Sequence, residues 1–398
     1  MLNTPFSPWP SFTEQEITAV SEVLRSNKVN YWTGQEGKQF EKEFAQFCDS
    51  KYAVAVANGT LALDLALQIL DINNGDEVIV TSRTFIASIS SIINAGATPV
   101  FADVELDSQN ISARTITAVI TDKTKAIMCV HLAGWPCEMD DIMALAAQHD
   151  LLVIEDCAQA HGTKYKGRPV GSIGHVGAWS FCQDKIMTTG GEGGMLTTND
   201  EQLWRKAWAY KDHGKSYAAV FEQQHPPGFR WLHESFGTNW RLTEMQSAIG
   251  RIQLTRMPQW QKSRQSNAEK IRQVCKQYTW LIVPQVPEYV VHAYYKCYIH
   301  VKLEQLPSNY SREKIITEIT QLGVPCLSGS CSEVYKEKAF DRTNLTPVTP
   351  LKNAKLLGEN SLMFLVHPTL TGEEINKSCY VLNSVFDVID QLIKKADK

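Results

Sequence analysis

The chain has 398 residues, of which 43% are hydrophobic and 21% charged, and its formal net charge is −4. This length can bury a large core and predicts two domains, or one large domain with an appendage. The composition is ordinary for a globular protein, and the slightly acidic balance argues against a nucleic-acid partner.

The N-terminus and the cysteines indicate the compartment. Residues 1–11 contain three prolines and no basic segment, which is not the pattern of a signal peptide. No apolar run reaches about eighteen residues, so we expect no membrane association. The ten cysteines include no CxxC pair, and Cys129, His131 and Cys137 do not match zinc spacing. We expect buried thiols, no metal and a cytoplasmic location.

Strand-like runs and helical patterns alternate from residue 52 to residue 198. Strands are predicted at residues 52–56, 78–80, 98–104, 126–131, 151–156, 176–181 and 194–197. Helices are predicted from Asn58 onward, near residues 85–95 and at residues 139–149. Strands separated by helices predict an α/β fold with a mostly parallel, seven-stranded sheet covered by helices on both faces.

The pattern changes after about residue 253. Met257-Pro258 predicts a helix break, and a helix rich in Arg, Gln and Lys follows. A strand is predicted at residues 294–303, and helices at residues 311–322 and 375–395. We therefore predict a large domain at residues 1–255, including an N-terminal arm, and a smaller C-terminal α+β domain at residues 256–398.

Asp156 and Lys185 are the most informative residues for chemistry. Asp156 ends a predicted buried parallel strand, at the edge where open α/β sheets place ligands. Lys185 follows the strand at residues 176–181 and precedes the glycine-dense turn 190–194. Pyridoxal phosphate (PLP) needs an amine for a Schiff base and a carboxylate for its pyridinium proton. A single Lys in a loop is usually a solvated charge, and a single Asp after a strand is usually a helix cap. The surrounding residues therefore decide whether these two form a PLP site.

Three further residue groups suit the same cofactor. Asn58-Gly59-Thr60 joins a strand to a helix start, where free N–H groups bind anions, although a plain N-cap is the alternative. Ser180 can add a hydroxyl to the same phosphate. Phe85 can lie flat on an aromatic ring, although a core phenylalanine is the alternative.

Competing motifs fail on their context. Gly214-Lys215-Ser216 resembles the end of a P-loop, but position 209 is Ala and no strand precedes it. The glycines at 190–194 open no helix after a first strand, so they are not a dinucleotide fingerprint. No Gly-x-Ser-x-Gly nucleophile elbow occurs.

Together these residues resemble the nucleotide-sugar aminotransferases of the DegT/StrS family, within the fold-type I PLP enzymes. The matching motifs are Trp32-Thr33-Gly34, Asn58-Gly59-Thr60-Leu61-Ala62-Leu63, Thr84-Phe85, Glu155-Asp156-Cys157-Ala158-Gln159-Ala160-His161-Gly162, Ser180-Phe181 with Lys185, Gly191-Glu192-Gly193-Gly194 and Asn239-Trp240-Arg241-Leu242-Thr243-Glu244-Met245-Gln246. They follow the family's order over roughly residues 30–255, and as a set they are specific.

The resemblance implies roles around the cofactor ring. Lys185 would form the Schiff base with PLP, and Asp156 would bond the pyridine nitrogen. Gln159 would lie over the ring or against its 3-hydroxyl, and Phe85 would stack on it.

The resemblance also implies the phosphate and substrate contacts. Gly59, Thr60 and Ser180 would hold the phosphate. Asn239 would reach the phosphate of the neighbouring subunit's cofactor, so a homodimer would share its active sites. Thr33 and Arg241 are the expected substrate contacts, with Arg241 meeting a carboxylate.

Two segments depart from the family pattern. The turn after Lys185 has one additional glycine, which would shift the loop under the sugar. Residues 323–331 replace an expected stretch bearing tyrosine and histidine near the sugar-nucleotide site. Both departures concern the identity of the substrate.

The implied activity is transfer of an amino group from L-glutamate to a nucleotide-linked keto-hexose, a 4-keto-6-deoxy or 3-keto sugar. The product would feed surface polysaccharide, such as lipopolysaccharide O-antigen, or a glycosylated metabolite. One alternative is a PLP-dependent sugar dehydratase, in which His replaces the Schiff-base Lys; Lys185 argues against it. The others are a non-catalytic PLP-binding regulator and a nicotinamide-dependent oxidoreductase, whose fingerprint is missing.

Overall fold

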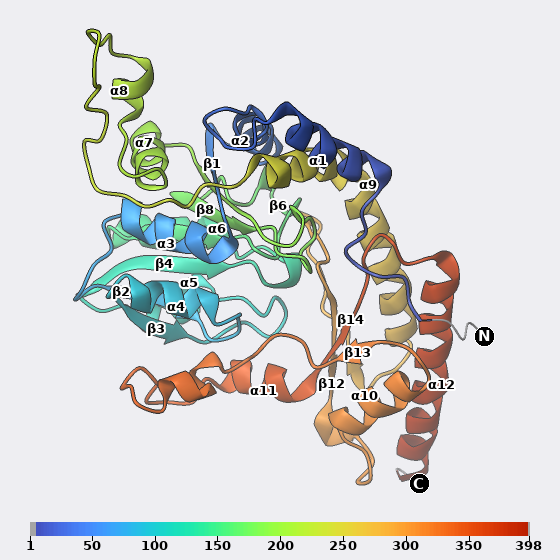
Figure 1. Ribbon diagram of the computed structural model, residues 1–398. Coiled ribbons are helices and arrows are strands. Elements are labelled where there is room, and N and C mark those ends of the chain that lie inside the picture. The colour runs from blue at the N-terminus through green and yellow to red at the C-terminus, as the bar shows by residue number, and fades with distance from the viewer. Residues whose placement is uncertain (1–4, 397–398) are drawn as a thin grey trace.

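A seven-stranded sheet organises the N-terminal part of the chain in the computed structural model, which describes residues 5–396 (Figure 1). Its spatial order is β1 (Tyr52–Val56), β9 (Gly194–Thr198), β8 (Val176–Ser180), β5 (Leu152–Asp156), β4 (Thr124–Val130), β2 (Glu77–Thr81) and β3 (Thr98–Ala102). The strands from β8 to β3 are parallel, and β9 is antiparallel to both of its neighbours. The predicted mostly parallel sheet is confirmed.

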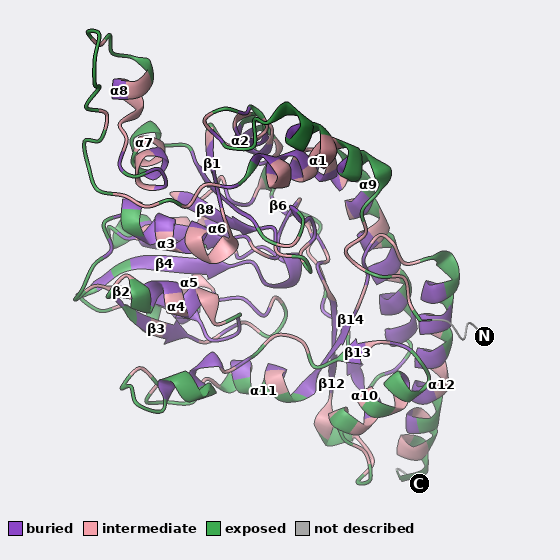
Figure 2. Cartoon of the chain, in the orientation of Figure 1, coloured by how far each residue is buried: buried purple, intermediate pink, exposed green. Residues whose placement is uncertain are grey.

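Helices cover both faces of this sheet, which explains why its strands are apolar throughout (Figure 2). Val78 and Val80 of β2 pack with one layer, whereas Ile79 between them packs with the opposite layer. The first layer contains α3 (Gly59–Ile69), α4 (Ala87–Asn94) and α7 (Glu201–Tyr210). The second contains α2 (Glu36–Phe47), α5 (Ala113–Thr117), α6 (Met139–Gln148) and the start of α9 (Glu244–Cys275).

A four-stranded antiparallel sheet forms the centre of the C-terminal part. Its order is β10 (Leu281–Ile282), β12 (Cys297–Val301), β14 (Ser361–Phe364) and β13 (Cys326–Leu327). Its apolar core also includes the end of α9, α10 (Arg312–Gln321) and α12 (Gly372–Ala396). A separate small sheet joins β11 (Val290–Val291), β6 (Lys164–Tyr165) and β7 (Arg168–Pro169). This arrangement matches the predicted α+β composition.

The helix break predicted at Met257-Pro258 is wrong. Helix α9 runs without interruption from Glu244 to Cys275, with Pro258 inside it. A proline in a helix interior removes one hydrogen bond and costs roughly 3 kcal/mol. Buried Met257 and Trp260, and packing of α9 against α1 (Glu14–Ser26), α2 and α12, offset that cost. The predicted division at residue 255 therefore falls within one helix.

The remaining elements lie at the periphery. Helix α8 (Tyr217–Phe221) belongs to a segment that projects from the large sheet at the upper left of Figure 1. Helix α11 (Lys352–Asn360) precedes β14. All ten cysteines are free thiols, and seven are buried. Within residues 5–396, no helix is both long and apolar enough to cross a membrane.

Candidate active site

Asp156 is a buried carboxylate at the carboxyl end of β5. Its Oδ2 accepts a hydrogen bond of 2.8 Å from the Ser88 hydroxyl, and its Oδ1 accepts one of 3.1 Å from the Ala158 N–H. Burial raises the pKa of Asp156, while these hydrogen bonds and the charge of Lys185 oppose the increase. A buried carboxylate with a raised pKa is suited to a cationic partner, and a protonated pyridine nitrogen is one.

Lys185 lies in the turn after β8, with its side chain 17% exposed. Its backbone is held on both sides: its N–H donates to the Cys182 carbonyl at 3.0 Å, and its carbonyl accepts from the Trp9 indole at 2.8 Å. Its Nζ lies 3.7 Å from Asp184 Oδ1 and 5.3 Å from the centre of the Tyr295 ring. The amine is therefore accessible, while the backbone that carries it is fixed.

Gly59, the first residue of α3, lies directly against Ser180 at the end of β8. A Cβ at position 59 would stand 2.5 Å from Ser180 Cβ, so only glycine fits here without a shift. Asn58 caps the helix by accepting from the Leu61 N–H at 2.9 Å, and the first turn carries no acidic residue. Gly59, Thr60 and Ser180 thus form a helix N-terminus with a neighbouring hydroxyl, as an anion site requires. Phosphate binding there stays a prediction.

The two residues expected near the cofactor ring occupy different environments. Phe85, between β2 and α4, is 68% exposed and is therefore not a core phenylalanine. Gln159 is buried, and its Oε1 accepts from the Ala133 N–H at 2.8 Å. Ala133 has φ of 56° within a short 3-10 turn (Leu132–Gly134). This contact fixes the orientation of the Gln159 amide.

Asn239 and Arg241 lie on a segment beside the end of β1, just before Gly59: the Ala57 N–H donates to the Trp240 carbonyl at 2.9 Å. Thr33 is exposed in a turn, where its hydroxyl donates to the Asn30 carbonyl at 3.2 Å. Arg241 pairs with buried Asp212, and Asn239 is exposed on the adjoining segment. Within residues 5–396 of one chain, none of these three forms a hydrogen bond or ion pair with Asp156 or Lys185.

Several contacts at the site were not predicted from the sequence. Ser88 lies one turn after Thr84, with 3.0 Å between the two hydroxyl oxygens, so helical spacing from Thr84-Phe85 was an available signal. Trp9 is 176 positions away from Lys185, and no local pattern indicates their contact.

Glu155, beside Asp156, serves the architecture of the site. It is fully buried and accepts hydrogen bonds from His131 at 2.9 Å and from the N–H groups of Gly171, Ile173 and Gly174. Burial alone would raise the pKa of Glu155, but the His131 and backbone hydrogen bonds outweigh it and hold that pKa below its usual value. Glu155 thereby ties the loop after β7 to the edge of the sheet.

His131, Glu155 and Cys157 have ligand atoms within 4.8 Å of one another. However, His131 Nδ1 accepts from the Cys137 N–H at 3.1 Å, and its Nε2 is bonded to Glu155. Both imidazole nitrogens are therefore committed to hydrogen bonds, which suits a structural network better than a metal centre.

The residues present fit PLP. A buried carboxylate, an accessible amine, an exposed aromatic face and a helix N-terminus with a hydroxyl surround the carboxyl edge of the parallel strands.

Comparison with known proteins agrees with this chemistry. Residues 10–383 match the sequence model of the DegT/DnrJ/EryC1/StrS aminotransferase family. The spore coat polysaccharide biosynthesis protein SpsC of Bacillus subtilis is 39% identical, over 98% of this chain and 97% of that protein. The GDP-perosamine synthase of Caulobacter vibrioides is 35% identical, over 93% of this chain and 98% of that protein. An X-ray structure of the aminotransferase from Psychrobacter cryohalolentis is 66% identical, with a TM-score of 0.96 over 97% of this chain and 100% of that one.

Proposed function

The chain belongs to the DegT/DnrJ/EryC1/StrS aminotransferase family, and we propose that it transfers the amino group of L-glutamate to a nucleotide-linked keto-hexose. It has the PLP fold type I, and PLP is its cofactor. PLP supplies an electron sink that stabilises negative charge at a substrate carbon. The roles of the chain's own residues follow from their positions.

Asp156 would hold the proton on the pyridine nitrogen, because a buried carboxylate gains most from a cationic partner. Lys185 would take the proton from the α-carbon of the donor amino acid. In the second half of the reaction it would return a proton to the sugar carbon that receives the amine. Gly59, Thr60 and Ser180 would bind the phosphate, and Phe85 and Gln159 would hold the ring from its two faces.

The observation that carries the proposal is an amine beside a buried carboxylate: Asp156 ends β5, Lys185 follows β8, and these two strands pair in parallel. An amine at this position supports transamination over sugar dehydration, in which His replaces it. The similarity to GDP-perosamine synthase supports a nucleotide-linked sugar as acceptor, and we propose a 4-keto-6-deoxy hexose. The similarity to SpsC supports a product destined for surface polysaccharide, such as an O-antigen.

We also propose that the working enzyme is a cytoplasmic homodimer with shared active sites. The projecting segment around α8 exposes three aromatic side chains, Phe229 at 79%, Trp231 at 84% and Phe236 at 98%. Such apolar exposure is unusual for a surface that faces only water. Asn239 follows these residues along the same segment and is itself exposed, as a residue that serves a partner's site must be. Ten free cysteines support a reducing compartment.

Spectroscopy of the PLP-loaded enzyme tests the proposal. Borohydride should abolish the visible absorbance band, and L-glutamate should bleach it. The glutamate-treated enzyme is then offered a panel of nucleotide-linked 3-keto and 4-keto hexoses, and the band should return with the accepted sugar. A band that glutamate leaves unchanged would indicate a non-catalytic PLP-binding protein. Bleaching by glutamate with no recovery on any keto-sugar would reject the proposed acceptor.

A further inference from the structure

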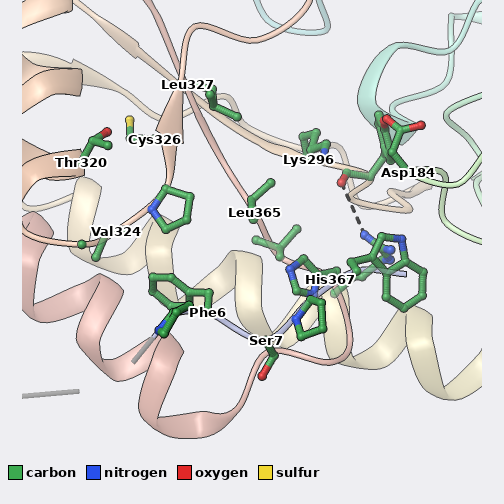
Figure 3. A pocket seen from close by; sticks show the side chains of 18 residues that line it. Phe6, Ser7, Asp184, Lys296, Thr320, Val324, Cys326, Leu327, Leu365 and His367 are labelled. Carbon is green, nitrogen blue, oxygen red and sulfur yellow. Dashed lines mark hydrogen bonds between the residues drawn. The ribbon is translucent and has the colours of Figure 1, made fainter. Parts of the chain in front are cut away.

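A cavity of about 620 Å³ adjoins the catalytic lysine (Figure 3). It lies between the N-terminal segment, the end of the chain's C-terminal sheet and the loop after β8. Asp184, next to Lys185, forms part of its wall, as does Trp9, whose indole holds the Lys185 carbonyl. None of the residues assigned above to PLP lines it. The cavity is therefore adjacent to the cofactor residues and distinct from them.

Arg264 of α9 lines this cavity with an uncompensated charge. The side chain is 1% exposed, and no carboxylate of residues 5–396 forms an ion pair with it. Its Nη1 makes two long hydrogen bonds, of 3.4 Å, to the carbonyls of Tyr294 and Tyr295. Its Nε and Nη2 have no partner in the described chain. A buried guanidinium in this condition gains strongly from an anion, and its planar donors suit a carboxylate or phosphate.

Lys296 adds a second cation to the same wall. Burial lowers the pKa of Lys296 to about 8, with the charges of Arg264 and Lys185 contributing and Asp184 opposing. Asp184 is the carboxylate of this wall, and the Tyr295 hydroxyl already donates to it. The wall therefore carries two cations, Arg264 and Lys296, and one carboxylate, Asp184, which already accepts a hydrogen bond.

His367 does not add a third positive charge. Burial and the charges of Arg264 and Lys296 lower the pKa of His367 to about 4, so the ring is neutral near pH 7. Its Nδ1 lies 2.8 Å from the Thr369 hydroxyl oxygen, and the ring stacks on Trp9.

The opposite end of the cavity is largely apolar. Figure 3 shows Lys296 and Asp184 at one end, and Phe6 and Val324 at the other. Pro325 and Leu327, from the stretch that departs from the family pattern, also line it. A ligand that fits has an anionic group at the Arg264 end and a carbon-rich part beyond it.

We propose that Arg264 and Lys296 bind the anionic group of a substrate of the transamination. The inference rests on the proposed function, because that reaction brings anionic substrates to Lys185. The shared chemistry is an oxyanion, supplied either by a carboxylate of the amino donor or by a phosphate of the nucleotide. Arg264 binds it through its guanidinium, two of whose donors have no partner among residues 5–396.

Calorimetry on the PLP-loaded enzyme tests this with two unreactive probes. Glutarate carries the carboxylates of the donor without its amine, and inorganic pyrophosphate carries the phosphates of the nucleotide. One of them should bind the wild type, and Arg264→Gln should weaken that binding more than tenfold. Arg264→Lys, which keeps the charge and loses the planar fork, should weaken it less. Glutarate binding assigns the site to the donor, and pyrophosphate binding assigns it to the nucleotide.

The matched control is Arg272→Gln. Arg272 is buried on the same helix, but its guanidinium is bonded to the Pro284 carbonyl at 2.8 Å and does not line the cavity. The Arg272→Gln variant should bind the probe as tightly as the wild type does. If Arg264→Gln does not fold, as judged by thermal unfolding, Lys296→Gln replaces it as the deciding variant.

Wild-type protein that binds neither probe overturns the proposal, and so does an Arg264 or Lys296 variant that binds as well as the wild type. Binding of either probe requires no transfer of an amino group. The binding measurements can therefore be interpreted even if the enzyme accepts none of the keto-sugars. If transamination is also confirmed, Arg264→Gln should raise the KM of the corresponding substrate with little change in kcat.

Discussion

Asp156 and Lys185, to which we assign the chemistry, differ in their burial. Burial raises the pKa of Asp156, and the Ser88 hydroxyl and Ala158 N–H keep its carboxylate aimed at one place. The Lys185 side chain is 17% exposed, on a backbone that Trp9 and Cys182 hold. Substitution of each residue should therefore affect a different property of the enzyme.

Lys185→Ala should retain some PLP but lose transamination, because no amine remains to form the Schiff base or to move the proton. Borohydride should then fail to attach the cofactor covalently, as measured by absorbance after denaturation. Lys185→Arg is the control for charge: it keeps a cation that forms no Schiff base and should be equally inactive. Turnover of purified Lys185→Ala at the wild-type rate would show that another residue does this work.

Asp156→Asn should bind PLP yet lose several orders of magnitude in kcat, since a neutral amide keeps the shape but does not hold the pyridinium proton. Single-turnover kinetics with L-glutamate measure the loss. Ser88→Ala is the matched control, because it removes one hydrogen bond of about 1 kcal/mol and leaves the carboxylate, so its loss should be about fivefold. Near-native kcat in Asp156→Asn is the result that contradicts this role.

At the scale of elements, the close approach of α3 to β8 should set the affinity for PLP. Gly59→Ala places a Cβ 2.5 Å from Ser180 Cβ, so the helix N-terminus must move away from the hydroxyl. We expect the PLP dissociation constant to rise at least tenfold in fluorescence titrations. Gly372→Ala is the matched control, because Gly372 also begins a helix and has no atom within 4 Å of the added Cβ. Equal PLP affinities of Gly59→Ala and Gly372→Ala would show that the contact between α3 and β8 does not set the affinity for PLP.

The network of Glu155 should make the loop at residues 171–174 sensitive to acid. The pKa of Glu155 is lowered in the folded chain relative to 4.5, so its stabilising contribution is complete above that value and is lost as the pH falls through the folded pKa. Glu155→Gln should lower the free energy of unfolding at pH 7 by about 3 to 5 kcal/mol, as for a broken buried pair. Urea unfolding from pH 7 down to about pH 3, through the range below 4.5, measures both effects; a variant as stable as the wild type at pH 7 would contradict this role.

At the scale of the whole molecule, complementation tests the shared active site. If Asn239 serves the partner's cofactor, a heterodimer of Lys185→Ala and Asn239→Ala chains has one site with both defects and one with neither. Mixing the two variants should restore up to half the native activity per dimer. If the chains exchange, as labelled subunits report, and activity stays at the sum of the parents, Asn239 acts within its own chain or has no role.

The sequence by itself determined the features that depend on neighbours along the chain. The apolar runs at residues 151–156 and 176–181 predicted β5 and β8, because a strand covered on both faces must be apolar throughout. Asn58-Gly59 predicted the start of α3 through its cap. The resemblance added Lys185 and its cofactor, and family membership confirmed PLP.

Only the tertiary structure decided what depends on residues distant in the chain. Pro258 predicts a helix break locally, yet α9 continues, since packing along its length outweighs one lost hydrogen bond. No local sequence pattern indicates the contact of Trp9 with Lys185, or that Arg264 lines a cavity with two donors unpartnered among residues 5–396. Burial removes water from these groups, and which groups then meet or lack a partner is set by the packing of the two sheets and the N-terminal segment.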